Sequence, residues 1–283
     1  MRRALVALGI AVIALAMVWL YLIFPGMAKL PADYSVVYHF EGTVQAANPQ
    51  TGALAAVPGG TKMDRTLQGT GINDADALIL TQVIKFTMAA NGAPLAAANP
   101  AFAALDSNET YAIDRTTRVN LAGGDKPRSG QFTFPLNVQK ETYQYWSATT
   151  NSTLPATFVS EDTVNGLKVY VFKIDSKGNA NPTNATQKID VAATIKVEPV
   201  SGTPIDSQLT TTINQLLPTG GSIPALINES HFTQATISEM VTEGKSNMNK
   251  IMWGSVYGFW GAIALGALLI VVGLVVKQKA KTA

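Results

Sequence analysis

The stretch TFVSEDTVNGLKVYVFKID, residues 157–175, decides the fold class because two extended segments in it flank the pair Asn165-Gly166. Asn-Gly is the preferred pair for a type I′ turn, since both central residues of that turn need positive φ. In the second segment, from Val169 to Ile174, β-branched and aromatic residues face opposite sides at alternate positions. The stretch therefore predicts a β-hairpin.

More strands are expected on both sides of this hairpin. Residues 188–199 (KIDVAATIKVEP) and 204–213 (PIDSQLTTTI) predict a second hairpin across the turn-forming sequence Ser-Gly-Thr-Pro. Residues 33–47 alternate like a half-buried strand. The periodicity of residues 77–88 fits a helix or a strand, and its β-branched and aromatic content favours a strand. Residues 48–76, rich in Gly, Pro, Asn and Asp, predict a loop with short extended pieces. We expect a β-rich α+β fold, with antiparallel sheets arranged as a sandwich or a barrel.

The N-terminal end has the composition of a membrane span. Arg2 and Arg3 precede an uncharged run, residues 4–24, whose helical length of about 30 Å matches the hydrocarbon core of a bilayer. A cleaved signal peptide shares the basic start and the apolar run. The run is longer than the apolar region of a signal peptide, and Trp19 and Tyr21 resemble an interfacial belt, so a retained anchor is favoured.

A second uncharged run, residues 251–276, lies near the C-terminal end. Aromatic residues stand at its upstream end and lysines follow it: Trp253, Tyr257 and Trp260, then Lys277, Lys279 and Lys281. This order predicts a helix that runs from the outer interface to the cytoplasm. Both termini are then cytoplasmic, and the chain is expected to be a two-pass protein of the cytoplasmic (plasma) membrane with its main domain outside.

A helix is also predicted upstream of the second run. Residues 236–239, Thr-Ile-Ser-Glu, fit a capping box, and Gly244 marks a place where the helix could break. The sequence divides as follows: 1–25 N-terminal anchor, 26–232 extracytoplasmic β-rich domain, 233–250 helical stalk, 251–276 C-terminal transmembrane helix, 277–283 cytoplasmic basic tail.

Charge and cysteine content exclude several classes of protein. The sequence has 21 Lys and Arg and 19 Asp and Glu, and five of the cations lie in the terminal segments, so the middle carries 16 cations against 19 anions, a net charge of −3. A nucleic-acid partner, which needs clustered cations, is not expected. There is no cysteine. The exported domain must therefore be held by its own core rather than by disulfides.

Several blocks in the middle of the chain resemble a known family. These blocks are YAIDRTTRVNL (111–121), GQFTFPLNVQKETYQYW (130–146), TVNGLKVYVFKI (163–174) and VEPVSGTPID (197–206). With the two terminal spans, they resemble the actinobacterial PorA-family or DUF3068 envelope proteins. The last block departs from that family's acidic-Pro-Glu-Thr-Gly form. The resemblance implies a role in envelope biogenesis through contact with lipids, glycolipids or their transporters, and it transfers no catalytic motif. The layout is also similar to CD36-type lipid receptors.

The sequence offers few residues for catalysis or metal binding. Histidine occurs only as His39 and His231, and there is no Gly-x-Ser-x-Gly elbow, so a hydrolase is disfavoured. Residues 73–76 (Asn-Asp-Ala-Asp) place oxygens at alternate positions, but Ile79 and Lys85 stand where an EF-hand needs glycine and a bidentate carboxylate. A solvated acidic turn is favoured. We expect a non-enzymatic protein without a cofactor or metal.

The densest aromatic group of the middle segment lies in the second family-like block, with arginines nearby in sequence. The aromatic residues are Phe132, Phe134, Tyr143, Tyr145 and Trp146, and the arginines are Arg115, Arg118 and Arg128. An ordinary sheet core is the favoured interpretation, because aromatic side chains bury large areas without any ligand. The alternative is a lipid or partner contact, in which the aromatics line an apolar cleft and the arginines meet a phosphate or sugar head group.

Four Asn-x-Ser/Thr sequons lie in the middle segment, at Asn108, Asn151, Asn184 and Asn228. They are glycosylation sites only if the source glycosylates exported proteins. The expected function is binding of membrane lipid, envelope lipid or glycolipid, or of a transporter or other membrane protein. The alternative is a structural subunit of a surface complex or porin-like oligomeric channel.

Overall fold

The computed structural model describes residues 2–48, 51–73 and 76–276, and these residues divide into two compact units. One unit is Leu30–Lys245, and the other combines the two terminal segments. Each unit is described by itself. The predicted basic tail, residues 277–283, and two residues of the acidic turn, 74–75, lie outside the described residues.

The terminal unit contains two apolar helical segments. The first comprises α1 (Arg2–Val18), the π-helix η1 (Trp19–Ile23) and α2 (Phe24–Met27). The second comprises the end of α3 (Gln234–Met252), the π-helix η4 (Trp253–Tyr257) and α4 (Gly258–Val275). Both segments are long and apolar enough to cross a membrane. The predicted apolar helix at each end of the chain is confirmed.

The two apolar helices pack closely against each other. A Cβ atom on Gly9 of α1 would collide with the carbonyl oxygen of Gly266 of α4, so small residues allow the backbones to approach. The indole Nε1 of Trp19 donates a hydrogen bond to the carbonyl oxygen of Gly254, at 2.9 Å. The bond joins the two π-helical stretches.

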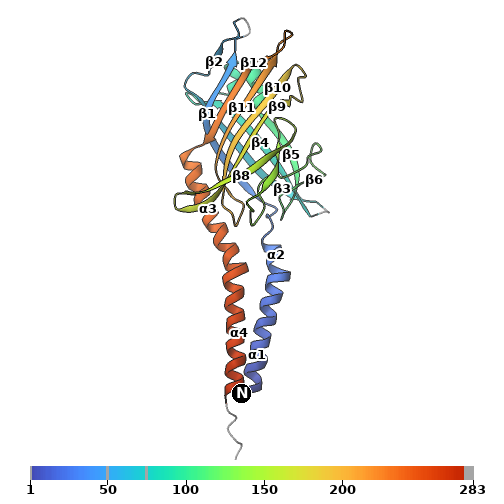
Figure 1. The fold of residues 1–283 in the computed structure, drawn as a ribbon, viewed down its shortest axis with the longest axis vertical. Coiled ribbons are helices and arrows are strands. Elements are labelled where there is room, and N and C mark those ends of the chain that lie inside the picture. The colour runs from blue at the N-terminus through green and yellow to red at the C-terminus, as the bar shows by residue number, and fades with distance from the viewer. Residues whose placement is uncertain (1, 49–50, 74–75, 277–283) are drawn as a thin grey trace, which may run out of the picture. The chain divides into compact units, whose positions relative to one another are not determined.

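The central unit is built on one large antiparallel sheet (Figure 1). The strands in chain order are β1 (Ser35–Ala47), β2 (Leu54–Ala56), β3 (Thr61–Ile72), β4 (Ala77–Met88), β5 (Ser107–Asp114), β6 (Asn120–Leu121), β7 (Thr142–Ser147), β8 (Ser152–Val164), β9 (Leu167–Ala180), β10 (Gln187–Val197), β11 (Pro204–Leu216) and β12 (Ser222–Phe232). Two 3₁₀-helices, η2 (Leu95–Ala97) and η3 (Pro100–Leu105), separate β4 from β5. The order across the sheet is β6-β5-β4-β3-β1-β12-β11-β10-β9-β8-β7, with β2 added to β1. The first and last long strands are therefore neighbours.

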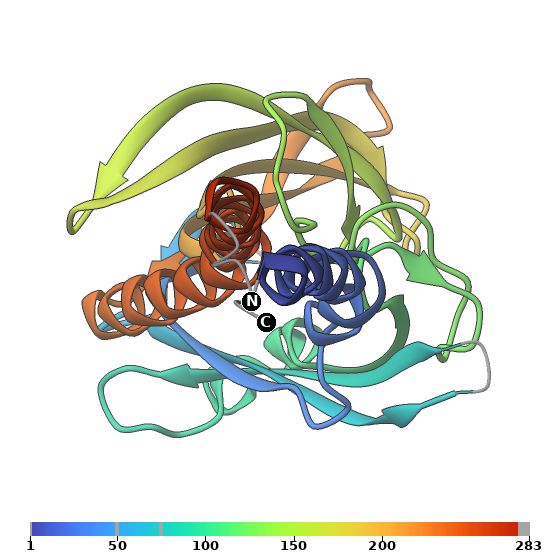
Figure 2. The ribbon, with the colours of Figure 1, turned by 90° about the horizontal axis from the view of Figure 1, so that it is seen from below.

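The sheet curves into a half-barrel, with the yellow-green strands β8 and β9 and the blue strands β1 and β3 on opposite sides of the curve (Figure 2). Its two edges are linked at Gln131, which forms isolated bridges to Val119 and to Tyr145. Gln131 N donates to Gln144 O at 2.6 Å, and the neighbouring Gly130 O accepts from Asn120 N at 2.9 Å. Gly130 has φ +67°, a conformation that favours glycine. One short segment thus completes the ring of strands.

One face of the sheet supplies the core. Strand register places the side chains of facing residues on the same side, and the buried apolar residues of neighbouring strands coincide on it. The main cluster lies on β7 to β10 and the segment before β7: Phe134, Val138, Tyr143, Leu154, Ala156, Phe172, Ile174, Ile189, Val191, Ile195 and Val197. The opposite face carries exposed polar residues such as Lys62 and Glu229.

The structure confirms the β-rich prediction and selects the barrel over the sandwich. Asn165 and Gly166 have φ +45° and +75° between β8 and β9, as the predicted type I′ turn requires. The second hairpin, β10–β11, and the strands β1 and β4 also form. The prediction of a loop over residues 48–76 is wrong for β3, a strand of 12 residues. Its alternation was obscured because an inward position holds the cation Arg65.

Helix α3 begins at Gln234, within the predicted helical stalk, 233–250, and upstream of the predicted capping box. The N-cap is Thr233, whose hydroxyl accepts a hydrogen bond from Thr236 N at 3.2 Å. The predicted capping box at residues 236–239 is therefore wrong, because the Thr236 hydroxyl donates to the carbonyl oxygen of His39 at 3.0 Å instead. The helix also runs through Gly244 without a break. Thr236 fastens the first turn of α3 to β1.

Candidate functional site

The predicted aromatic group forms part of the sheet core. Phe134 is 1% exposed, and its ring lies 4.5 Å from Phe172, 5.4 Å from Tyr143 and 5.6 Å from Tyr145, centroid to centroid. The contacts with Tyr143 and Phe172 are edge-on or tilted, geometries that stabilise aromatic pairs. These rings pack β7 and β9 against the segment before β7, as the favoured interpretation of a sheet core predicts.

The other two aromatic residues of the group lie around the link between the sheet edges. Phe132 is buried, and its ring lies 4.8 Å from that of Tyr111 on β5. Trp146 is buried on β7, and its backbone N donates to Gln131 O at 2.8 Å. Phe132 therefore belongs with a second, more polar group of residues on β1, β3, β4 and β5, rather than with the main apolar cluster.

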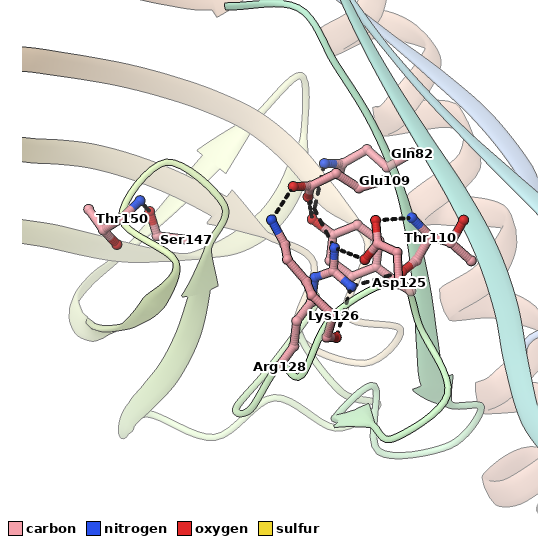
Figure 3. A network of polar contacts seen from close by, with 9 residues as sticks. Gln82, Glu109, Thr110, Asp125, Lys126, Arg128, Ser147 and Thr150 are labelled. Carbon is pink, nitrogen blue, oxygen red and sulfur yellow. Dashed lines mark hydrogen bonds and ion pairs between the residues drawn. The ribbon is translucent and has the colours of Figure 1, made fainter. Parts of the chain in front are cut away.

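Arg128 sits at the centre of an ionic network (Figure 3). Its Nη2 lies 2.6 Å from Asp125 Oδ1 and 3.4 Å from Glu109 Oε2, and its guanidinium stacks 3.8 Å from the centroid of the Tyr111 ring. Lys126 adds a second cation to Glu109. The arginine side chain is 2% exposed. The network neutralises Arg128 and ties the loop before Gly130 to β5.

The same network shifts the acidity of its members. Burial opposes ionisation of Glu109, but hydrogen bonds from Lys126 and Tyr111 outweigh it and lower the pKa of this carboxyl. Burial, followed by the hydrogen bond to Glu109, raises the pKa of Tyr111. Glu109 therefore stays ionised and Tyr111 stays protonated at neutral pH. From there hydrogen bonds continue inward, because Gln82 Nε2 donates to Tyr111 Oη at 3.3 Å and Gln82 Oε1 accepts from Arg65 at 2.7 Å.

Arg115 is also committed to the structure. Its Nη1 donates to Asp76 Oδ1 at 2.8 Å, and its Nε donates to the carbonyl oxygen of Leu30 at 2.7 Å. Leu30 N donates in turn to the carbonyl oxygen of Arg115 at 3.0 Å. These contacts fasten the segment that enters the domain to the turn after β5.

Arg118 differs from the other two arginines. The residue is 5% exposed and has φ +64°, and its Nη1 has no hydrogen-bond partner. Burial lowers its pKa to about 10, so the guanidinium remains charged at neutral pH. Its charge lowers the pKa of Tyr34, and Tyr34 and Tyr38 influence each other's pKa. Arg65 reaches the same pair, with its guanidinium carbon 6.0 Å from the Tyr38 ring centroid and 5.7 Å from that of Phe132.

A buried carboxylate that the sequence analysis did not single out organises the loop between β10 and β11. Glu198 is 1% exposed; it accepts hydrogen bonds from Val200 N at 2.9 Å and from Ser201 N and Oγ, both at 2.6 Å. Val138 N and Asn137 N donate to carbonyl oxygens of this loop. The family-like blocks 197–206 and 130–146 are therefore in contact, and the acid-Pro-x-Ser-Gly pattern was the signal for it.

The two histidines lie on the surface, whereas the four sequons differ in exposure. His39 pairs with Asp64 at 2.7 Å, and His231 lies 3.4 Å from Glu41, on the exposed face of the sheet. Within residues 2–48, 51–73 and 76–276, no group of three or more His, Asp or Glu could hold a metal ion. Of the sequons, Asn108 and Asn151 are exposed, Asn184 is half-buried and Asn228 is 5% exposed. Asn228 is inaccessible to a glycosyltransferase in the folded domain.

A curved antiparallel sheet on a chain that ends in two long apolar helices defines a membrane protein of the cell envelope. The sequence matches the family Porin PorA over residues 3–275. The chain belongs to this family, as the resemblance of its middle blocks predicted. A comparison with curated proteins gave no match.

Proposed function

We propose that this is a non-enzymatic two-pass protein of the cytoplasmic membrane whose extracytoplasmic sheet domain binds a lipid, a glycolipid or an envelope-biogenesis partner. Both termini are cytoplasmic in this proposal, because basic residues precede the first apolar segment and follow the second one. The observation that carries it is the attachment of the domain at each of its two ends to a helix that can span a bilayer.

The length of the entering connection limits how far the domain can act from the bilayer. Only residues 28–34 separate α2 from β1. An extended chain covers about 3.3–3.6 Å per residue, so this connection reaches about 25 Å at most. Leu30 and Tyr34 belong to the connection and are already in contact with the sheet domain. Work at the membrane surface is therefore favoured over capture of a distant soluble partner.

The ionisable groups of the domain support a binding role. Glu109, Asp125 and Glu198 are engaged in ion pairs or backbone hydrogen bonds that hold loops in place. Groups held in this way are poor proton-transfer catalysts, because moving the proton would break the structure around them. Arg65, by contrast, faces the rings of Tyr38 and Phe132, and Arg118 Nη1 is buried without a hydrogen-bond partner among the described residues.

Lipid analysis of the purified full-length protein tests this proposal. The protein is solubilised in a mild neutral detergent, and bound molecules are identified by native mass spectrometry and by solvent extraction. We expect a lipid, a glycolipid or an envelope membrane protein to remain bound in stoichiometric amount. A preparation that retains none of these, and that takes up none when lipids are added back, would contradict the proposal.

The second candidate is a subunit of an oligomeric channel, which the name of the family favours. Two helices cannot enclose a pore, so several copies would have to assemble. Native mass spectra of an oligomer, together with ion conductance in planar bilayers, would support this candidate. A monomer without conductance would exclude it.

A further inference from the structure

We infer that Arg118, Arg65 and the hydroxyls of Tyr34 and Tyr38 form a binding site for an anionic group of the phosphate or carboxylate class. This inference rests on the proposed function and specifies its ligand as one with an anionic head group. The four residues come from the connection before β1, from β1, from β3 and from the turn between β5 and β6. The fold alone brings them together.

Arg118 has hydrogen-bonding capacity that the described residues do not satisfy. Buried polar groups in folded proteins nearly always have a partner, and a buried charged donor without one costs more than a neutral donor. Arg118 Nη1 is such a donor. The nearest acid in sequence, Asp114, accepts instead from the backbone N of Thr116 and Thr117, at 2.8 and 2.6 Å. An acceptor supplied by a ligand would satisfy Arg118.

Two arginines that have no ion pair within the described part of the chain act on the tyrosine pair, Tyr34 and Tyr38. Among the residues that the structure describes, neither Arg118 nor Arg65 forms an ion pair with a carboxylate, and the charges of both lower the pKa of Tyr34. Glu243 on α3 acts in the opposite direction on both tyrosines. The guanidinium carbon of Arg65 lies 6.0 Å from the Tyr38 ring centroid, and Arg118 acts on the pKa of Tyr34. Planar guanidinium donors of this kind are what proteins use to bind carboxylate and phosphate.

The tyrosines add neutral donors to the two cations. Burial raises the pKa of both hydroxyls, so they stay protonated. A protonated tyrosine hydroxyl can donate a hydrogen bond to an anion. Tyr34 is half-buried, whereas Arg118 and Tyr38 are buried, so a ligand would approach from the side of Tyr34.

Arg115 and Arg128 show why the inference concerns Arg118. Arg115 is paired with Asp76. Arg128 is paired with Asp125 and Glu109, which neutralise it even though its Nε has no hydrogen-bond partner. Of the three arginines predicted to meet a head group, Arg118 alone forms no ion pair among the residues that the structure describes, and Asp114 acts on it only as a nearby charge.

The test compares an anionic lipid, a zwitterionic lipid and a soluble anion. Delipidated full-length protein in neutral detergent is titrated with dioleoylphosphatidylglycerol or dioleoylphosphatidylcholine, and occupancy is read by native mass spectrometry. In parallel, inorganic phosphate is added at constant ionic strength, with chloride as the reference, and the thermal unfolding midpoint is measured. The variants are Arg118→Gln, Arg118→Lys and Arg65→Gln. Lys62→Gln is the matched control. This substitution also removes one positive charge from β3, the strand of Arg65, but from its exposed face.

We expect phosphatidylglycerol to bind the wild-type protein and Lys62→Gln with equal affinity. It should bind Arg118→Gln and Arg65→Gln about tenfold or more weakly, because a charge-assisted hydrogen bond contributes about that factor to affinity. Arg118→Lys should keep part of the affinity, which also shows that the position tolerates substitution. If phosphate stabilises the protein in an Arg118-dependent way and binding of phosphatidylglycerol does not depend on Arg118, the site binds a soluble anion. The inference is overturned if both lipids bind equally and independently of Arg118, and if phosphate does not change the unfolding midpoint. The proposed function still stands in that case. If neither lipid binds and phosphate still stabilises the protein in an Arg118-dependent way, the inference holds with a soluble anion as the ligand. The proposed function is then decided by the analysis of bound lipids and partners described above.

Discussion

Replacing Glu198 by alanine tests how the domain holds its two family-like blocks together. The carboxylate is 1% exposed and accepts three hydrogen bonds, two from backbone N–H groups and one from the Ser201 hydroxyl. A hydrogen bond to a charged group contributes about 1.5–3 kcal/mol, and the three do not add fully because they share one carboxylate. The substitution also leaves the two N–H groups without their acceptor. We expect a loss of about 3–5 kcal/mol in the free energy of unfolding.

This loss corresponds to a lower unfolding midpoint by about 6–20 °C, since about 1 kcal/mol shifts the midpoint of a domain of this size by about 2–4 °C. The measurement is thermal unfolding of the full-length protein in detergent, followed by far-ultraviolet circular dichroism. Glu198→Gln should be less severe, because the amide keeps one acceptor oxygen. Glu239→Ala, an exposed position on α3, is the control and should change little. An unfolding midpoint for Glu198→Ala within about 2 °C of wild type would refute the reasoning.

Three further predictions concern other parts of the chain. The pKa of Glu109 is lower in the folded state than in the unfolded state, so ionised Glu109 stabilises the fold fully above its unfolded-state pKa. This stabilisation is lost as the pH falls through the folded-state pKa. Unfolding midpoints of the wild-type protein and Glu109→Gln, measured from pH 7 to pH 3, should therefore converge. Gly166→Val, at φ +75°, should cost about 1–2 kcal/mol in a thermal unfolding experiment, and an unchanged midpoint would contradict the turn. The chain has no cysteine, so the pair Leu5→Cys and Gly273→Cys should oxidise to an intramolecular disulfide, because a Cβ on Gly273 would lie 3.0 Å from that of Leu5. Mass spectrometry after proteolysis reads the cross-link, and it should be absent when Leu15 is replaced in place of Leu5.

The strands that could be predicted from the sequence are those specified by local chemistry. The hairpin at Asn165-Gly166 follows from a turn that needs positive φ at both residues, and β4 follows from its β-branched content. Strand β3 was missed because inward Arg65 and the glycines near its end hide the alternation. The link at Gln131 joins strands far apart in sequence, and no local pattern indicates such a pairing.

The candidate site shows the same division between local and remote information. The dense aromatic group was correctly located in sequence, but its use in packing depends on Phe172, which comes from a different block. Of the three arginines, Arg128 has a local partner, Asp125, that the sequence displays three residues earlier. The partner of Arg115, Asp76, comes from a remote loop. That Arg118 lacks a compensating acid could be recognised only once these partners were known.

The adjacency of β1 and β12 in the middle of the sheet has a consequence for biogenesis. Facing positions of these strands are 180–192 residues apart in the sequence, for example Gly42 and Ser230. At a synthesis rate of about 5–20 residues per second, β1 waits about 10–40 s before its partner emerges. The meanders β1-β3-β4-β5 and β7 to β12 can each pair as they appear, but the junction between them closes last. During that interval β1 presents an open strand edge, the kind of surface that a chaperone binds.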